Sequence, residues 1–201
     1  MKNNILLIIS LFAINLIASQ DLKLPSIFSD NMILQQDSNV SVWGWSKPNS
    51  QVLINVSWNE NTFKVESSDE GKWILKIKTP KSGLSHQISL QSGDHRVLIS
   101  NILLGEVWIA SGQSNMQMNL NGYRNEPIKG ANDAIAKSDN SKIRFFTVER
   151  NTSNIPLDDV KGNWSVSNQE NSPYFSAVAY SFAKYLNNVL KVPVAIIHTS
   201  W

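Results

Sequence analysis

Apolar and polar positions alternate over short stretches throughout the first half of the chain. The pattern predicts strands at residues 40–45, 52–58, 63–65, 72–77, 87–90 and 96–99, which turn-forming residues separate at 47–50, 59–61, 69–71 and 92–94. The strands recur about every ten residues with no helical period between them, as in small all-β domains. We therefore expect an antiparallel β-sandwich domain over residues 20–100.

The pattern changes after residue 100. Residues 107–110 form an unbroken apolar run, as in a strand covered on both faces, and 143–148 is a second candidate strand. A short helix is expected within 130–138. The clearest helix begins at Ser172-Pro173, a capping residue and a proline, and Pro193 ends it before a buried strand at 194–197. Its apolar face is expected to hold Phe175, Val178, Ala179, Phe182, Leu186 and Val189.

Strands that alternate with helices predict a three-layer α/β structure with a parallel sheet over residues 101–201. Two or three strands with one good covering helix leave apolar faces unburied, and about half of a usual α/β domain is present. We therefore expect this domain to be truncated and the chain to be the N-terminal fragment of a longer protein.

The first 19 residues have the pattern of a secretory signal peptide. Lys2 gives a positive start, residues 5–17 are mostly apolar, and the small Ala18 and Ser19 precede the polar Gln20. A membrane anchor is the alternative, but the apolar core is shorter than the roughly 20 residues of a spanning helix. We expect export to the periplasm or extracellular space, with no membrane insertion after signal cleavage. The sequence has no cysteine, so no disulfide can form and the core alone must stabilise the exported protein.

Charge and composition limit the classes of ligand that the protein is expected to bind. The net charge of +2 comes from 18 basic and 16 acidic residues spread along the 201-residue chain, without a basic run, so nucleic acid is not an expected partner. No cluster of His, Asp or Glu has metal-ligand spacing, so no metal or other cofactor is expected. Four tryptophans of the first half either pack in the core, the favoured interpretation, or line a sugar-binding face; they are Trp43, Trp45, Trp58 and Trp73.

Residues 107–116, VWIASGQSNM, lead from a buried strand directly into a small polar turn. Ligands of open parallel sheets bind beyond the carboxyl ends of the strands. Gly112 permits a sharp turn, Ser114 is expected to point its hydroxyl outward, and the following N–H groups are expected to face a developing negative charge. Acyl transfer needs such an arrangement. On the pattern alone, an ordinary turn in which Ser114 or Asn115 caps a helix remains the alternative.

Two other motifs do not fit this turn. A phosphate-binding loop requires a lysine after a second glycine, and no lysine follows here. The elbow of α/β-hydrolases requires a glycine two positions after the serine, where the chain has Met116.

Residues 105–116, GEVWIASGQSNM, resemble the nucleophile block of the sialate O-acetylesterases, a family of SGNH hydrolases. Residues 24–36 and 42–45 resemble the start of that family's β-sandwich, and 175–180 and 192–201 resemble its helix and next strand. These blocks keep their order and spacing over essentially the whole chain after the signal segment. The resemblance implies a β-sandwich followed by the first part of an SGNH-type domain.

Carried over residue by residue, the resemblance implies that Ser114 is the nucleophile and that its backbone N–H is one oxyanion-hole donor. Gln113 stands where the wider superfamily has aspartate, as it does in this family, and with Asn115 it is expected to fix the turn after Gly112 by hydrogen bonds. The family pattern places a glycine donor, an asparagine block and an Asp-x-x-His base after Trp201. Because serine without a base is a weak nucleophile, the chain alone is expected to be inactive.

Three histidines are present, and His198 is the candidate base within the chain, since it follows a buried strand toward the edge where Ser114 is expected. In the family pattern its position precedes the glycine pair, so we expect a positioning or structural role, with Ser200 and Trp201 beside it at the edge of the site. His86 and His95 are expected on the surface of the sandwich.

Together with the signal pattern, the resemblance implies an exported esterase that removes O-acetyl groups, from sialic acids as in that family, through an acyl-enzyme on Ser114. The substrate is then an acetylated sugar or glycan. Acetylated xylan or another acetylated glycan is the alternative substrate, and a non-catalytic carbohydrate-binding module is the alternative from another class. The oligomeric state stays open.

Overall fold

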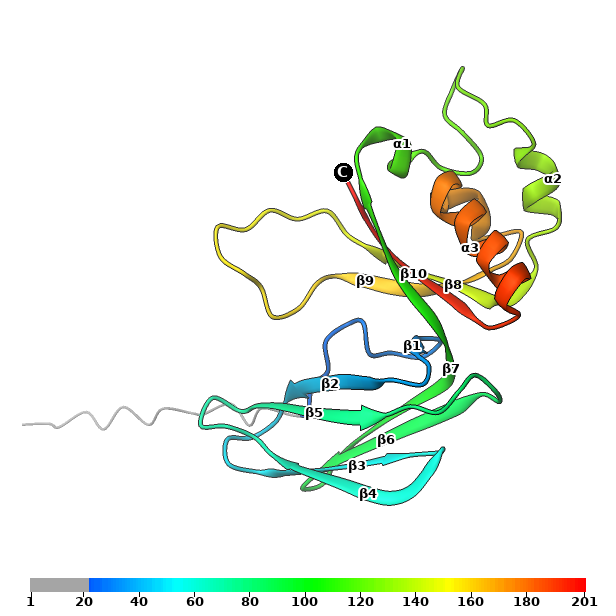
Figure 1. Ribbon diagram of the computed structural model, residues 1–201. Coiled ribbons are helices and arrows are strands. Elements are labelled where there is room, and N and C mark those ends of the chain that lie inside the picture. The colour runs from blue at the N-terminus through cyan, green and yellow to red at the C-terminus, as the bar shows by residue number, and fades with distance from the viewer. Residues whose placement is uncertain (1–21) are drawn as a thin grey trace, which may run out of the picture.

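The computed structural model in Figure 1 describes residues 22–201. Strands of the N-terminal part lie at one end, and the helices gather at the other end against a second group of strands. The predicted signal peptide, residues 1–19, lies outside the described residues. No helix in the described part of the chain is long and apolar enough to span a membrane.

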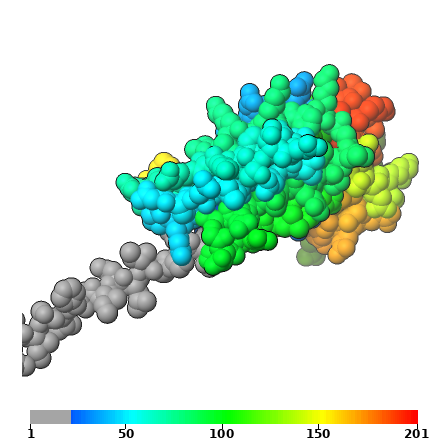
Figure 2. All heavy atoms as spheres, turned by 90° about the horizontal axis from the view of Figure 1, so that it is seen from below, coloured from blue at the N-terminus to red at the C-terminus, as the bar shows by residue number. Residues whose placement is uncertain are grey.

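The N-terminal strands form two antiparallel arrangements. β2 (Asn39–Trp45) pairs with β5 (Lys72–Lys78) in a two-stranded sheet. The second arrangement has the order β4-β3-β6-β7, with bounds Asn59–Glu66, Gln51–Val56, His86–Ser92 and His95–Gly112. Seen from below, cyan and green residues of this part cover most of the visible face, with the orange and red residues at one end (Figure 2).

The first hairpin turns earlier than the sequence predicts. Val56 pairs with Asn59, so the turn consists of Ser57 and Trp58 and not of residues 59–61. Trp58 is held there because its indole Nε1 donates to the carbonyl oxygen of Lys78 at 3.0 Å. This hydrogen bond stabilises a turn at Trp58 more than the turn propensity of Asn59 and Asn61 stabilises a later one.

β7 joins the two ends of the molecule. Its first part pairs antiparallel with β6, and its last part, from Glu106 to Gly112, pairs in parallel with β10 (Val194–Ser200). The register between β6 and β7 shifts near Asn101, which has a positive φ of 55°, as in a β-bulge. The expected domain boundary at residue 100 thus falls inside a strand of 18 residues.

The predicted parallel sheet is confirmed. β10 lies between β7 and β8 (Asn140–Val148) and pairs in parallel with both. β1 (Ile33–Gln35) also pairs in parallel with β7, and β9 (Gly162–Ser167) adds an antiparallel edge to β8. Parallel strands put their carboxyl ends at one edge, so the segments that follow β7, β8 and β10 emerge together.

The α-helices are α1 (Ser114–Gln117), α2 (Ala131–Ala136) and α3 (Ala177–Leu190). α3 begins after Ser176, whose hydroxyl accepts from the N–H of Ala179, and not at Ser172-Pro173 as expected. Ser172–Tyr174 instead forms a separate 3-10 turn. Both serines are fully buried, and Ser176 caps the long helix because the backbone of Phe175, just before it, is extended and ends the 3-10 turn.

The buried face of α3 also differs from the prediction. Val178, Phe182 and Val189 are 40–58% exposed, whereas the residues that pack on the sheet are Ala177, Ala179, Tyr180, Ala183 and Asn187. Small alanines allow the helix to approach the sheet closely, which larger side chains at the same positions prevent. The periodicity is helical, but the contact face is about one residue away from the most apolar stripe.

One continuous core joins the N-terminal strands to the parallel sheet. Val42 and Trp73 from the two-stranded sheet belong to the same buried cluster as Ile54, and that cluster also includes Phe146 and Ala195 of the parallel sheet. The helices cover the opposite face of the parallel sheet. Because the core does not end at the sheet boundary, a separate β-sandwich domain stays a prediction.

The tryptophans that were expected in the core differ in how deeply they are buried and in what they contact. Trp73 is 3% exposed, and its Nε1 is buried without a hydrogen-bond partner among residues 22–201. Trp43 is partly buried and packs edge-on against Phe28, with ring centroids 4.6 Å apart. Trp45 lies below the ammonium group of Lys23. These contacts are those of packing residues.

Candidate active site at the carboxyl edge of the parallel sheet

Ser114 is the first residue of α1, two positions after β7 ends at Gly112. It is exposed, and its hydroxyl makes no hydrogen bond within residues 22–201. It thus stands at the carboxyl edge of the sheet, where a substrate has access.

α1 is short and is held by contacts with the start of α3. The N–H of Ala177 donates to the carbonyl oxygen of Met118 at 2.8 Å, and the buried hydroxyl of Ser176 contacts the sulfur of Met116 at 3.5 Å. Within the turn, the N–H of Met118 donates to the carbonyl oxygen of Ser114 at 2.9 Å. Because four residues do not form a stable helix alone, these contacts fix the position of Ser114.

Gly112 has the conformation that the tight turn requires. Its φ is +153°, and a Cβ built there would lie 3.1 Å from the Cβ of Met116. The carbonyl oxygen of Gly112 accepts from the N–H of Trp201, so the end of β10 also supports the turn. A side chain at Gly112 would strain the backbone and push against α1.

Gln113 and Asn115 flank the serine and are both exposed. Neither side chain makes a hydrogen bond inside the described part of the chain, although we expected these amides to fix the turn. The carbonyl oxygen of Gln113 does accept from the N–H of Gln117 at 3.0 Å. The backbone therefore holds this turn, and the two amide side chains face solvent, where they can meet a substrate.

His198 lies at the same edge, on β10, with 8% of its surface exposed. Its Nε2 is 2.7 Å from the hydroxyl oxygen of Ser200. Burial lowers the pKa of His198 below its ordinary value of 6.5, and a hydrogen bond with the backbone of Met116 opposes this shift less strongly. The imidazole is therefore neutral at pH 7 and bridges β10 and α1.

The two other histidines lie far along the fold from Ser114. The Nδ1 of His86 is 2.9 Å from the hydroxyl of Ser57, at the antiparallel sheet, and burial lowers its pKa. His95 begins β7 at the end opposite to Ser114. Among residues 22–201, only His198 of the three histidines approaches the candidate site.

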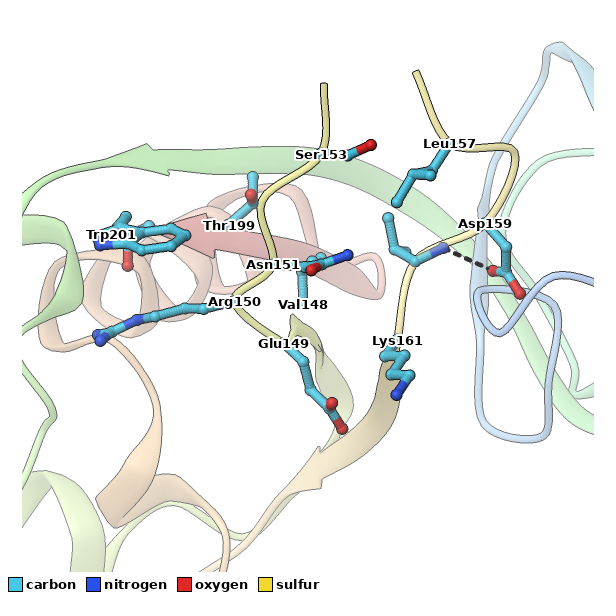
Figure 3. A pocket seen from close by; sticks show the side chains of 12 residues that line it. Val148, Glu149, Arg150, Asn151, Ser153, Leu157, Asp159, Lys161, Thr199 and Trp201 are labelled. Carbon is cyan, nitrogen blue, oxygen red and sulfur yellow. Dashed lines mark hydrogen bonds between the residues drawn. The ribbon is translucent and has the colours of Figure 1, made fainter. Parts of the chain in front are cut away.

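Two hollows open at this edge. A pocket of about 530 Å³ contains Ser114 and Asn115 together with Tyr123 and Glu126 from the loop after α1. A second pocket, of about 610 Å³, lies between the end of β10 and the loop of residues 149–161 that joins β8 to β9 (Figure 3). Ser200 and Trp201, expected at the edge of the site, line this second pocket.

Sequence reasoning missed the loop of residues 149–161. It contributes Arg150, Asp159 and Lys161 to the second pocket, and Figure 3 shows Arg150 beside Trp201. The loop has no hydrophobic period, so no pattern marks it. The long stretch without a predicted element between the strand expected at 143–148 and the helix expected at Ser172-Pro173 was a usable signal, since long loops without secondary structure are often functional.

The chain resembles known proteins in sequence and in structure. No protein-family model matches the chain. The chain is 29% identical to a sialate O-acetylesterase of Mus musculus over 196 residues, covering 89% of this chain and 36% of the relative. It is 26% identical to the sialate O-acetylesterase of Homo sapiens, of which it covers 37%.

A solved structure agrees with the sequence relatives. The chain superposes on a carbohydrate acetylesterase from Xanthomonas citri with a TM-score of 0.83 and 28% identity, covering 90% of this chain and 40% of that one. The chain thus spans between a third and two fifths of the length of these proteins. The resemblance to the sialate O-acetylesterases that the sequence motifs indicate is confirmed over most of this chain.

Proposed function

We propose that this chain carries the nucleophile of a carbohydrate esterase that removes O-acetyl groups from sialic acids. The observation that carries the proposal is the exposed Ser114 on a tight turn at the carboxyl edge of the parallel sheet, beside a pocket. Sialate O-acetylesterase relatives and an acetylesterase of similar structure support the reaction class.

The proposed reaction follows from the atoms at this turn. The Ser114 oxygen attacks the acetyl carbonyl carbon, a base takes the hydroxyl proton, and the sugar alcohol leaves with a proton. Water then attacks the acetyl-serine ester and releases acetate. The backbone N–H of Ser114 has no acceptor within residues 22–201, so it is available to the oxyanion that forms in each step.

His198 is proposed as a positioning residue and not as the base. Its Nε2 is already bonded to Ser200, and its other contact is with the backbone of Met116. No hydrogen bond joins Ser114 to any histidine among residues 22–201. We propose that the base comes from a part of the protein beyond this chain, as relatives about three times as long allow.

The test compares acetate release from O-acetylated sialic acid by this chain, its Ser114→Ala variant and the longest natural form of the protein that carries it. We expect activity in the long form, loss of that activity with Ser114→Ala, and turnover near background in the short chain. Loss of the triad base alone lowers kcat by about six powers of ten in a well-studied serine hydrolase. A short chain that matches the long form and loses its activity with His198→Ala would identify His198 as the base.

Acetylated xylan is the matched control substrate, because it carries the same ester on a neutral sugar. Faster release from xylan than from sialic acid would change the proposed substrate and leave the role of Ser114 intact. Export is part of the proposal, on the signal pattern of residues 1–19. Sequencing the amino terminus of the secreted protein tests it, with a start near Gln20 expected.

A further inference from the structure

The pocket between β10 and the loop of residues 149–161 lies one strand away from Ser114. Ser200, in its wall, pairs with Gly112 across the β7–β10 ladder, and Ser114 follows Gly112 by two residues. Neighbouring strands lie about 4.8 Å apart, so the wall of this pocket at Ser200 is one strand spacing from the end of β7, which leads into the turn of Ser114. Nothing in the chemistry proposed above uses this pocket.

Arg150 and Trp201 form a distinct pair in its lining. The guanidinium carbon of Arg150 lies 6.0 Å from the centroid of the Trp201 ring, and Trp201 is 61% exposed. Figure 3 shows the two side chains next to each other, whereas Glu149 and Lys161 extend away from them. An exposed indole with a guanidinium over its ring offers an aromatic surface and a planar set of donors in one place.

The acidic groups of the pocket do not neutralise Arg150. The Asp159 carboxylate accepts from the backbone N–H groups of Ser26 at 3.0 Å and Val160 at 2.8 Å. Arg150 has no salt-bridge partner among residues 22–201, where the ion pairs join Lys72 to Glu70 and Asp158. The donors of Arg150 are therefore available to a ligand with a carboxylate.

We propose that Arg150 and Trp201 form a subsite for the ring of an acidic sugar, with the carboxylate on Arg150 and the apolar face of the ring on Trp201. This inference rests on the proposed function and deepens it, because the subsite would favour an acetylated sialic acid over acetylated neutral sugars. Arg150 is then the residue that determines this preference. Arg suits the role better than Lys because its fork matches both carboxylate oxygens.

The test measures binding and does not need turnover. The 201-residue chain is titrated with N-acetylneuraminic acid, the O-deacetylated product, and with its methyl ester, which lacks the charge and carries one added methyl group on the carboxyl. The signal is the indole N–H resonance of Trp201, assigned with Trp201→Phe. We expect the acid to shift this resonance and to bind about tenfold or more tightly than the methyl ester, since the ester cannot make the charged hydrogen bonds.

Arg150→Gln should remove this preference for the acid, and Lys161→Gln, the matched loss of a cation in the same pocket, should keep it. The inference is overturned if the acid and its methyl ester bind alike, if the acid does not bind, or if both variants lose the preference equally. A failure of Ser114 as the nucleophile can be told apart from a failure of this subsite, because an inactive chain can still bind the acid and an active chain can fail to bind it.

Discussion

At the scale of single residues, Arg144 shows how a buried charge ties distant segments together. It is 1% exposed, yet its guanidinium has no carboxylate partner within residues 22–201. It donates to the carbonyl oxygens of Asn31 at 2.8 Å, Asn101 at 2.6 Å and Ser141 at 3.1 Å. Burial lowers the pKa of Arg144 to about 10, so it keeps its charge at neutral pH. It joins β8 to the bulge of β7 and to the segment before β1.

Arg144→Met should lower the free energy of unfolding by about 3 kcal/mol, because the variant leaves buried carbonyl groups without donors. Urea unfolding followed by tryptophan fluorescence measures the change. Arg150→Met is the control, since that side chain is exposed and its loss should change stability by no more than about 0.5 kcal/mol. Equal effects of the two substitutions would contradict the structural role of Arg144.

His198 predicts a pH dependence of stability. Its folded pKa is lowered below 6.5, so the unfolded chain binds the proton more readily and stability falls as pH decreases below about 6.5. The slope is at most ~1.4 kcal/mol per pH unit, and it ends once the folded state also takes up the proton. His198→Gln should lose less stability than the wild type between pH 7.5 and 5.0.

Urea unfolding at several pH values tests this difference. His86→Gln is the comparison, because burial also lowers the pKa of His86, away from the candidate site. A His198→Gln variant with the same pH slope as the wild type would show that His198 carries its proton equally in both states.

At the scale of elements, apolar patterns predicted most strands and the existence of the main helix. β2, β3, β5 and β6 appear where alternation indicated them, and β10 follows Pro193 as expected. Two strands were not predicted. β1 has three residues and exists through its pairing with β7, and β9 is an edge strand whose partner is remote until the chain folds.

The candidate site was also partly predictable from local apolar patterns. The break from residues 107–110 into Ser111-Gly112 is a local signal, and it placed Ser114 beyond the end of a strand. The positions of Arg150 and Trp201 follow from the loop of residues 149–161 meeting the end of β10, which no local pattern records. The contacts of His198 with Ser200 and Met116 likewise depend on tertiary packing.

The turn at Gly112 gives a prediction for α1. Gly112→Ala should accelerate hydrogen exchange of the Met118 N–H, which donates to Ser114, because the added Cβ strains the backbone and meets Met116. Gly93→Ala is a matched control, since Gly93 also has a positive φ but has no atom within 4 Å of its added Cβ. Both substitutions should reduce stability by about 1 kcal/mol or more, and only the first should affect α1. Equal acceleration at Met118 would contradict this.

At the scale of the whole molecule, β7 makes the two ends interdependent. It passes residue 100 without interruption, and one buried cluster includes residues from both sides of that position. We expect limited proteolysis of the folded chain to release no stable piece that ends near Ser100, since cleavage there requires a paired strand to open. Mass spectrometry of the fragments is the measurement. A folded product of residues 20–100 would contradict the shared core.

The length of this chain compared with that of its relatives also bears on the whole molecule. The chain covers 36% of the Mus musculus relative and 40% of the solved Xanthomonas citri structure. The proposed division is that this chain supplies the serine, its turn and the acidic-sugar subsite, while the base comes from elsewhere in a longer protein. On this proposal, we expect the short chain to bind sugar without efficient turnover.

The most direct measurement of the central claim is to trap the acyl-enzyme in the longest natural form of the protein. The protein is mixed with an activated acetyl ester, quenched in acid and digested, and its peptides are analysed by mass spectrometry. We predict one acetyl group on Ser114, and none on the same peptide from Ser114→Ala. Acetate release with no acetyl group on Ser114, or with the Ser114→Ala variant still active, would contradict the account.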